Sequence, residues 1–222
     1  MNRKQRRAEG KNKKNLSGQD TSQKEMTIDK ALAMALSCHQ AGNLDEAEQL
    51  YSQILSFQPD NADALHLLAA IGIDKKMYEQ AIELLGRALA AKPDFPEAYN
   101  TLGAALAGLG RIEDAAVVYG KAIELKPDYA EAYGNLGLAF DKLGEFEAAI
   151  GAYSKLLEFN SKDEKALINL GNALFKSGAL SEAINAFKQA IVVNPNNAMA
   201  YSNLGNIYSD QGKLDDAMEA HR

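Results

Sequence analysis

Hydrophobic residues after position 27 recur at the spacing of an amphipathic helix. Apolar residues in the segment 96–129 form two runs: Tyr99, Leu102, Leu106 and Leu109, and then Ala115, Val118, Tyr119, Ala122, Ile123 and Leu125. Residues at intervals near 3.6 lie on one face of an α-helix, so each run predicts a helix with one apolar face. Gly110 lies between the runs, where a left-handed glycine ends a helix without steric cost. The pattern therefore predicts a helix–turn–helix hairpin.

The end of the hairpin is also marked in the sequence. Pro127 follows the second run. We expect it to end the second helix, because the residue before a proline disfavours the helical region and proline has no N–H to donate. Asp128 comes next, and Asn196 and Asn197 occupy a similar place farther along the chain. Their side-chain oxygens are predicted to serve turns and helix N-caps.

The hairpin pattern repeats with a fixed period along the chain. Alanine marks this period at Ala47, Ala81, Ala115, Ala149, Ala183 and Ala217. Glycine follows it between the helices at Gly42, Gly110, Gly144, Gly178 and Gly212, with Lys76 as the exception. Bulky residues follow it at Tyr51, Leu85, Tyr119, Tyr153 and Phe187. Several series in one register indicate an array of structural repeats of about 34 residues, in which each hairpin buries its apolar face against the next.

A second glycine series lies inside the predicted first helices. Its members are Gly103, Gly137, Gly171 and Gly205, continued backward by Ala69 and Ala35. A mid-helix glycine costs about 0.5–1 kcal/mol relative to alanine, so a recurring one needs compensation. We expect the first helix to approach the second closely at this glycine, opposite Ala115 and its equivalents. The bulky residues are then predicted to fill the space toward the neighbouring repeat.

The recurring residues resemble the tetratricopeptide repeat family. The resemblance rests on Tyr99, Leu102, Gly103, Ala115, Tyr119, Ala122 and Pro127, and on the same set shifted by whole periods. It implies an all-α fold, a right-handed α-solenoid of stacked antiparallel helix hairpins. The repeats would occupy 28–61, 62–95, 96–129, 130–163, 164–197 and an incomplete 198–222. The first two repeats depart from the pattern, with Ala31 and Leu65 at the position that favours an aromatic residue.

Charge divides the chain at the start of this array. The 222 residues contain 24 Lys and Arg and 30 Asp and Glu, which gives a net charge of -6. Residues 1–27 carry eight basic and three acidic side chains and few apolar ones. Such a segment buries too little surface to order itself, so we predict a disordered basic tail. It would either serve solubility or weakly contact nucleic acid, an acidic partner or anionic lipid.

The remaining residues, 28–222, carry 16 basic and 27 acidic side chains. This net negative charge disfavours nucleic-acid binding by the array. No apolar stretch approaches the ~20 residues that span a bilayer, so we predict no membrane insertion and a cytoplasmic protein. Residues 1–27 also lack the apolar core of a signal peptide.

The sequence offers little chemistry for catalysis. Cys38 is the single cysteine and lies on an apolar helix face, so we expect a small buried hydrophobe and not a nucleophile. His39, His66 and His221 fall in different repeats, without partners at ligand spacing. No phosphate-binding or zinc-protease motif occurs. We therefore predict a protein without enzymatic activity, cofactor, metal site or small-molecule substrate.

The resemblance implies that the first helix of each hairpin lines a concave groove. The polar residues expected there are Asn100, Asn135, Asn169, Asn172, Asn203 and Asn206, with Lys142, Lys165 and Lys176 nearby. Asn135, Asn169 and Asn203 follow one another at one period and are predicted to stack as a ladder. A related asparagine ladder holds substrate polypeptide in the helical arm of O-linked N-acetylglucosamine transferases. The alternative interpretation is that these amides bond across neighbouring helices and only support the fold.

Three functions remain open at this stage. The first is a non-catalytic interaction module or scaffold that binds a peptide or protein segment in the groove. The second is the substrate-recruiting arm of a larger glycosyl-, sulfo- or methyltransferase, with the catalytic domain beyond residue 222. The third is self-association through an uncapped C-terminal end, where residues 214–222 are expected to be the least protected part of the array.

The variety of the family that clamps a C-terminal carboxylate is disfavoured. It would place lysine where this chain has Asn100, Gly134, Ile168 and Ser202.

Overall fold

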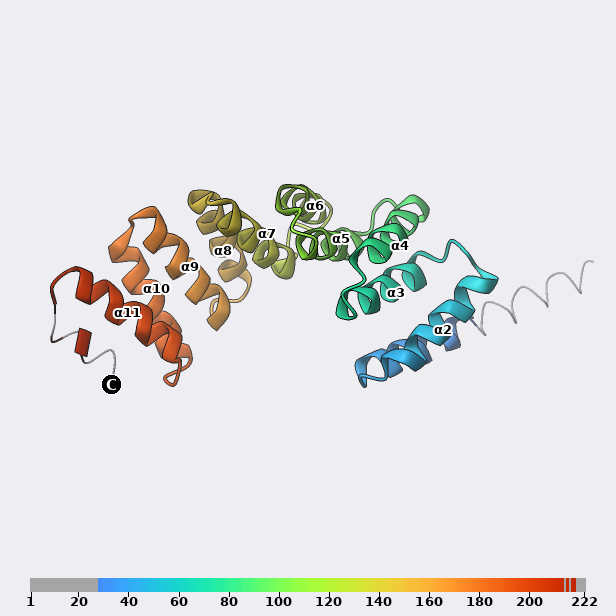
Figure 1. The fold of residues 1–222 in the computed structure, drawn as a ribbon, viewed down its shortest axis with the longest axis horizontal. Helices are drawn as coiled ribbons and strands as arrows, with labels where there is room; N and C mark the ends of the chain where they lie inside the picture. The colour runs from blue at the N-terminus through green and yellow to red at the C-terminus, as the bar shows by residue number, and fades with distance from the viewer. Residues whose placement is uncertain (1–27, 214, 216, 219–222) are drawn as a thin grey trace, which may run out of the picture. The chain divides into compact units, whose positions relative to one another are not determined.

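The computed structural model describes residues 28–213, 215, 217 and 218, and these residues contain helices and no strand. Residues 28–40 are helical. The labelled helices follow in order (Figure 1): α2 Leu44–Phe57, α3 Ala62–Asp74, α4 Tyr78–Ala91, α5 Pro96–Gly108, α6 Ile112–Leu125, α7 Ala130–Leu143, α8 Phe146–Phe159, α9 Glu164–Ser177, α10 Leu180–Val193 and α11 Ala198–Asp210. The fold is all-α, as predicted. The predicted tail, 1–27, and most of 214–222 lie outside the described residues.

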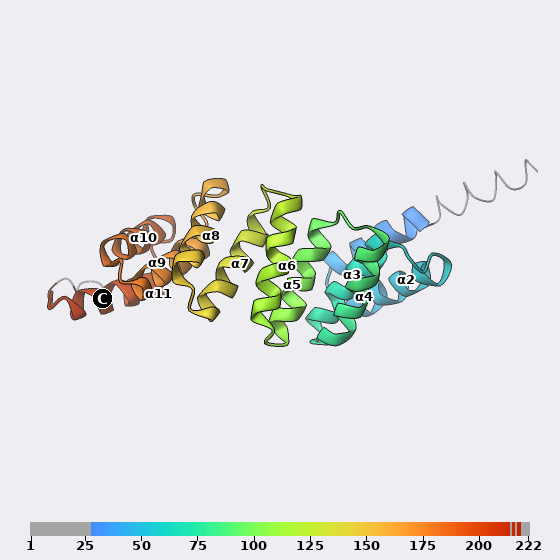
Figure 2. The same ribbon diagram turned by 90° about the horizontal axis from the view of Figure 1, so that it is seen from above.

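The chain divides into two compact units, Met1–Lys92 and Pro93–Arg222. In the first unit α3 packs against α2 and α4. In the second unit each helix packs against the next, so that α5/α6, α7/α8 and α9/α10 form hairpins that stack in sequence order (Figure 2). Helices α3, α5, α7, α9 and α11 each begin at the first residue of a predicted repeat.

The first helices of the second unit also contact one another. Helix α5 contacts α7, α7 contacts α9, and α9 contacts α11, whereas α6, α8 and α10 have no mutual contact of similar extent. Successive first helices are therefore closer together than successive second helices. This difference places α5, α7, α9 and α11 on the inner side of the stack in Pro93–Arg222.

The turn between the two helices of a hairpin requires a left-handed residue. Gly110 has a φ of 78°, and Gly42, Gly144, Gly178 and Gly212 have φ angles of 72–88°. No atom lies within 4 Å of the place where a side chain would begin at any of these five glycines, so it is the backbone angle that favours glycine there. The predicted role of Gly110 is confirmed. Lys76 occupies the same position in the second repeat and has a φ of 60°.

Replacing Lys76 with glycine is expected to stabilise the first unit by about 0.5–1 kcal/mol, because lysine is strained in the left-handed region and glycine is not. Urea denaturation followed by circular dichroism measures the change. The reverse substitution, Gly110→Lys, is the control and should destabilise the second unit. An unchanged or lower midpoint for Lys76→Gly would show that its backbone is not strained.

Among the labelled helices, α3, α9 and α11 begin with a side-chain cap. Asn61, Asp163 and Asn197 each accept a hydrogen bond from a backbone N–H three residues later, at 2.9, 2.9 and 2.7 Å. The prediction for Asn197 is confirmed, and that for Asp128 is wrong. The residue that precedes α7 is Tyr129, which provides no side-chain cap, and Asp128 serves the turn through its backbone carbonyl.

The mid-helix glycines allow close packing within each hairpin. A Cβ atom on Gly103 would lie 2.4 Å from Cε1 of Tyr119. The same distance is 2.5 Å from Gly137 to Tyr153 and 2.6 Å from Gly171 to Phe187. The predicted close approach is present. The atoms nearest to the added Cβ belong to the bulky ring of the same hairpin, which was predicted to fill the space toward the neighbouring repeat.

The core continues from one repeat to the next. In the C-terminal part of the second unit, a single cluster joins residues of three helices: Leu167 and Ile168 of α9, Ala183, Phe187 and Ala190 of α10, and Ala200 and Ile207 of α11. A hairpin therefore completes the burial of its apolar side against its neighbour, as expected for a stack of repeats.

Candidate functional site

The candidate site is the inner face, which we define as the solvent-accessible side of α5, α7, α9 and α11. The structure places the predicted site residues on these helices at different depths. Asn100 is buried, with 4% of its surface exposed. The half-buried residues are Asn135, Asn169, Asn172 and Asn203, and the exposed ones are Asn206, Lys142, Lys165 and Lys176.

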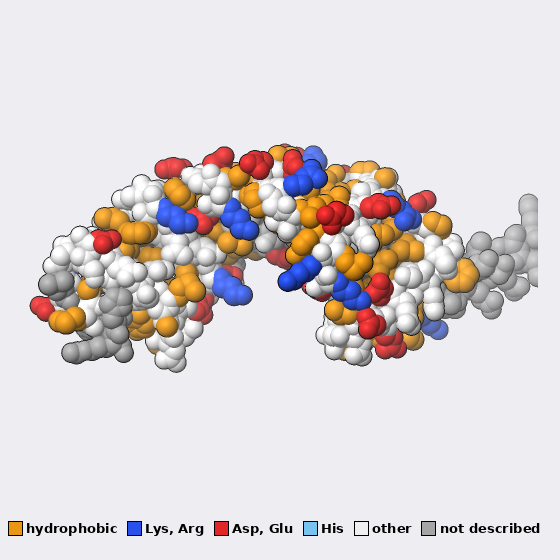
Figure 3. Space-filling view, viewed as in Figure 1, with side chains coloured by type: hydrophobic (Ala, Val, Ile, Leu, Met, Phe, Trp, Pro, Cys, Tyr) orange, Lys and Arg blue, Asp and Glu red, His pale blue; other side chains and the backbone are white. Residues whose placement is uncertain are grey.

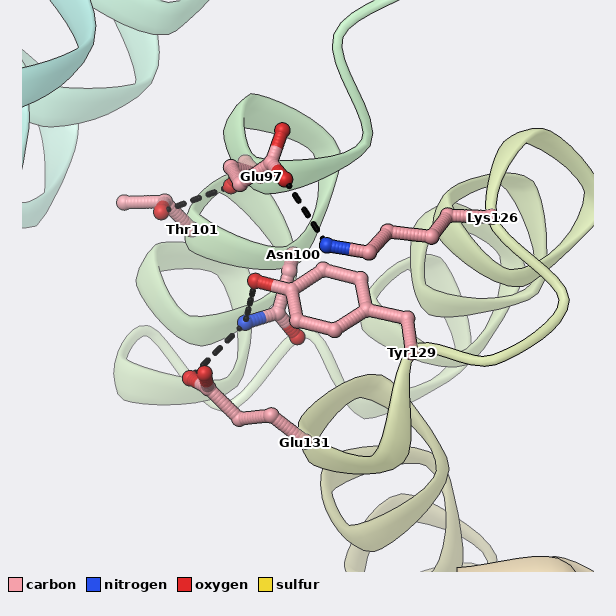
Figure 4. A network of polar contacts seen from close by, with 6 residues as sticks. All are labelled: Glu97, Asn100, Thr101, Lys126, Tyr129 and Glu131. Carbon is pink, nitrogen blue, oxygen red and sulfur yellow. Dashed lines mark hydrogen bonds and ion pairs between the residues drawn. The ribbon is translucent and has the colours of Figure 1, made fainter. Parts of the chain in front are cut away.

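Asn100 joins α5 to α7 through three hydrogen bonds, and those to Tyr129 and Glu131 are drawn in Figure 4. Its Nδ2 donates to Oε1 of Glu131 at 3.0 Å and to the hydroxyl of Tyr129 at 3.4 Å. Its Oδ1 accepts from Nδ2 of Asn135 at 3.0 Å. Both amide hydrogens and the carbonyl oxygen are therefore engaged within the array, so Asn100 holds the two helices together and is not available to a ligand.

The same network contains an ion pair. Nζ of Lys126 donates to Oε1 of Glu97 at 3.2 Å and lies 4.7 Å from the centre of the Tyr129 ring. Burial raises the pKa of Tyr129 to about 12, and the negative charges of Glu131 and Glu97 act in the same direction. The phenol therefore remains protonated at neutral pH.

Replacing Asn100 with alanine is expected to cost about 1–3 kcal/mol of unfolding free energy, because three hydrogen-bonding groups lose a buried partner. Urea denaturation measures the loss. The control is Asn206→Ala on α11, an exposed position where a change within about 0.5 kcal/mol is expected. Equal stability of the two variants would mean that the network does not support the fold.

Asn135, Asn169 and Asn203 lie one period apart on α7, α9 and α11, and no described hydrogen bond joins any two of them. The amides pair instead with residues at other separations. Asn135 donates to Asn100, 35 residues earlier, and Nδ2 of Asn203 donates to Oδ1 of Asn172, 31 residues earlier, at 2.9 Å. Amide bonding across neighbouring helices, the alternative interpretation, is therefore present at these two pairs.

The contact register explains why these equivalent amides do not bond to one another. Asn100 contacts both Glu131 and Asn135, which are 31 and 35 residues away and one helical turn apart on α7. Lys176 and Asp141 are also 35 residues apart. Residues that face each other on successive first helices are thus separated by 31 or 35 residues. A residue one full period away is rotated out of reach by about 100°.

Several predicted site residues keep free polar groups. Among the described residues, no hydrogen bond or ion pair involves the side chains of Asn169, Asn206, Lys142 or Lys165. Asn135 and Asn203 use their Nδ2 atoms, but no described residue donates to their Oδ1 atoms. Lys176 differs, because its Nζ binds both oxygens of Asp141 at 2.8 and 2.9 Å and lies 5.4 Å from the centre of the Phe146 ring.

A pocket of about 120 Å³ opens on the inner face between α5, α6 and α7. It brings together two predicted residues, Asn135 and Lys142, with the apolar residues Ala107, Ile112, Tyr119, Leu138 and Ala139. Burial raises the pKa of Tyr119 to about 12, so this wall of the pocket is uncharged. The apolar lining was not predicted from the sequence. The available signal was Ala107, which takes the place that Asp141 has in the next repeat.

The described residues contain no group of three or more His, Cys, Asp or Glu side chains arranged to hold a metal ion. Cys38 is half-buried, and partial burial together with Glu46 raises the pKa of its thiol. His39 lies on the same helix, with Nε2 at 4.0 Å from Asp74. His221 lies outside the described residues. No helix among the described residues has the length and apolar character needed to cross a membrane.

The visible surface carries both signs of charge. Figure 3 shows acidic and basic side chains interspersed over the face in view, with apolar side chains between them. Such a surface suits contact with protein segments of mixed composition better than contact with a uniformly charged polymer.

Comparisons with known proteins agree with this geometry. The family model described as "Cilia and flagella-associated protein 70 C-terminal domain", a tetratricopeptide repeat model, matches residues 3–222. No curated protein sequence matches the chain. Among solved structures, MamA is 30% identical, covers 74% of this chain and 96% of its own, and has a TM-score of 0.67.

Two further structures share the fold at lower identity. PilF of Pseudomonas aeruginosa has a TM-score of 0.76 at 22% identity and covers 87% of this chain and 88% of its own. YrrB, described as a tetratricopeptide repeat protein with an unusual peptide-binding site, has a TM-score of 0.65 at 21% identity and covers 77% of this chain and 88% of its own. The chain belongs to the tetratricopeptide repeat family, and within it to the family of the cilia and flagella-associated protein 70 C-terminal domain.

Proposed function

We propose that the inner face of Pro93–Arg222 binds an extended segment of a partner protein and that the protein acts as a non-catalytic interaction module. The observation that carries this proposal is the set of inner-face amides and lysines for which the described residues provide no partner. They are Asn169, Asn206, Lys142 and Lys165, together with the Oδ1 atoms of Asn135 and Asn203.

The chemistry of these groups suits a peptide backbone. A side-chain amide has two donors and one acceptor, so it pairs with a peptide N–H or C=O whatever the peptide's side chains are. In Asn169 on α9 and Asn206 on α11, both the donor and the acceptor atoms of the amide remain available. The pocket between α5 and α7 adds a place for one side chain of the bound segment. The peptide-binding site named for YrrB is further support from a protein of the same fold.

The test is the double variant Asn169→Ala/Asn206→Ala, which removes free amides without breaking a described hydrogen bond. The full chain is used to select a phage-displayed library of random linear peptides, and enriched peptides are then titrated by fluorescence anisotropy. Each lost amide–backbone hydrogen bond is worth about 0.5–1.5 kcal/mol, so the Kd is expected to rise about five- to a hundredfold.

The matched control is Asn185→Ala. Asn185 is an exposed amide on the second helix α10, where it accepts a 3.4 Å hydrogen bond from Gln189, so its loss should leave the Kd unchanged. The proposal fails if the wild-type chain enriches no peptide, or if the double variant binds as tightly as the control.

A further inference from the structure

Side chains 35 residues apart meet on successive first helices, as Asp141 and Lys176 do, and in two places among the described residues a carboxylate meets a basic side chain. Nε2 of His39 lies 4.0 Å from Oδ2 of Asp74 in the first unit. Oδ1 of Asp141 lies 2.8 Å from Nζ of Lys176 in the second. We call the contact between two such side chains, 35 residues apart on successive first helices, the inter-repeat contact. In the second case the lysine also covers the ring of Phe146, at 5.4 Å from its centre.

The inter-repeat contact between α5 and α7 is different. Its members are Ala107 and Lys142, which precede Asp141 and Lys176 by one period. Alanine offers no carboxylate, and no described residue forms an ion pair with Lys142. Ile112 stands in place of Phe146 and lacks the ring that Lys176 covers. The pocket of about 120 Å³ lies at this contact, with Ala107, Ile112 and Lys142 in its wall.

The pocket therefore combines an apolar lining with a cation that no described residue pairs. Leu138 is 44% exposed and Tyr119 is 3% exposed, so the lining runs from the surface to the core. A cavity of about 150 Å³ holds a benzene ring, so the smaller volume here suits an aliphatic chain. The lysine ammonium is a compact charge with three donors, and its natural partner is a carboxylate.

We propose that this pocket binds a glutamate side chain of the partner peptide, whose carboxylate completes the ion pair that Asp141 gives to Lys176 in the next repeat. The two methylenes of glutamate lie on the apolar lining, and its carboxylate accepts from Nζ of Lys142. The free Oδ1 of Asn135 accepts a backbone N–H of the same peptide. This inference rests on the proposed function and specifies which partner segments the inner face selects.

The test compares peptides that differ only in the charge of one residue. A peptide enriched from the random library and containing glutamate is titrated against its Glu-to-Gln counterpart, with the full chain. The wild-type chain is expected to bind the glutamate peptide about three- to tenfold more tightly. Lys142→Gln should abolish this preference, and Lys142→Glu should select lysine or arginine instead of glutamate from the library.

Two further variants test whether the preference depends on net charge and whether it depends on the missing carboxylate. Lys188→Gln removes an exposed positive charge on the second helix α10 and should leave the preference intact. Ala107→Asp supplies inside the protein the carboxylate that the pocket lacks, so it should remove the preference while thermal unfolding shows the chain still folded.

The results separate this inference from the proposed function. If the wild-type chain binds peptides but glutamate is not preferred, or if Lys142→Gln or Ala107→Asp keeps the preference, the pocket assignment is wrong and peptide binding stands. If no peptide is enriched, both are wrong.

Discussion

Replacing Phe187 with alanine is expected to lower the free energy of unfolding by about 3–5 kcal/mol, the usual cost of removing a buried aromatic ring. The side chain is 1% exposed, lies on Gly171 and belongs to the cluster that joins α9, α10 and α11. Because each repeat is stabilised mainly by its neighbours, the loss should be local. Amide hydrogen exchange should show reduced protection in α9–α11 and little change in α5.

The control for this variant lies on the same helix. Val192 is 81% exposed on α10, so Val192→Ala should change stability by no more than about 0.5 kcal/mol. A uniform loss of protection from α5 to α11 would contradict a stack of semi-independent repeats. A loss no larger than that of the control would contradict the placement of Phe187 in the core.

Replacing Gly137 with alanine is expected to destabilise the chain although alanine is the better helix former. The new methyl group would lie 2.5 Å from the ring of Tyr153, far inside a normal contact. Overpacking of this kind costs about 1–3 kcal/mol and outweighs the roughly 0.5–1 kcal/mol gained from helix propensity. Tyr153 is 1% exposed, so its ring has little space into which it can move. Urea denaturation measures the net change.

The same hairpin contains a matched control. Gly151 lies within α8, and no atom lies within 4 Å of the position that its Cβ would take. Gly151→Ala should therefore stabilise by about 0.5–1 kcal/mol. The second repeat has Ala69 and Leu85 at the positions of Gly137 and Tyr153. Gly137→Ala should therefore destabilise the chain less when it is combined with Tyr153→Leu, which removes the ring. Equal effects of Gly137→Ala and Gly151→Ala would rule out a close approach at Gly137.

Much of the fold could be predicted because local signals agree with the period. The apolar runs, the turn glycine at position 110 and the proline at 127 each specify a helix or its end, and repetition confirms each assignment several times. Lys76 is instructive, since it breaks the glycine pattern and still adopts the left-handed angle of 60°. The turn therefore keeps its geometry even where the residue disfavours it.

The candidate site was only partly predictable, since periodicity identifies equivalent residues and not facing ones. Asn135 and Asn169 are equivalent, yet Asn135 bonds to Asn100 because helices in contact meet at separations of 31 or 35. These separations depend on how successive first helices pack against each other. The sequence of one repeat does not specify that packing. The pocket at Ala107 could not be predicted for the same reason. Its missing carboxylate becomes apparent only because Asp141, the equivalent residue of the next repeat, forms an ion pair with Lys176.

Photo-crosslinking tests most directly whether a peptide lies along the inner face. A benzophenone amino acid is placed at Leu138, which lines the pocket and is 44% exposed, or at Val117 on the second helix α6, which is 73% exposed. Peptides enriched by the wild-type chain should crosslink at position 138 and not at position 117. Equal crosslinking at both positions, or crosslinking at 117 alone, would contradict binding on the inner face.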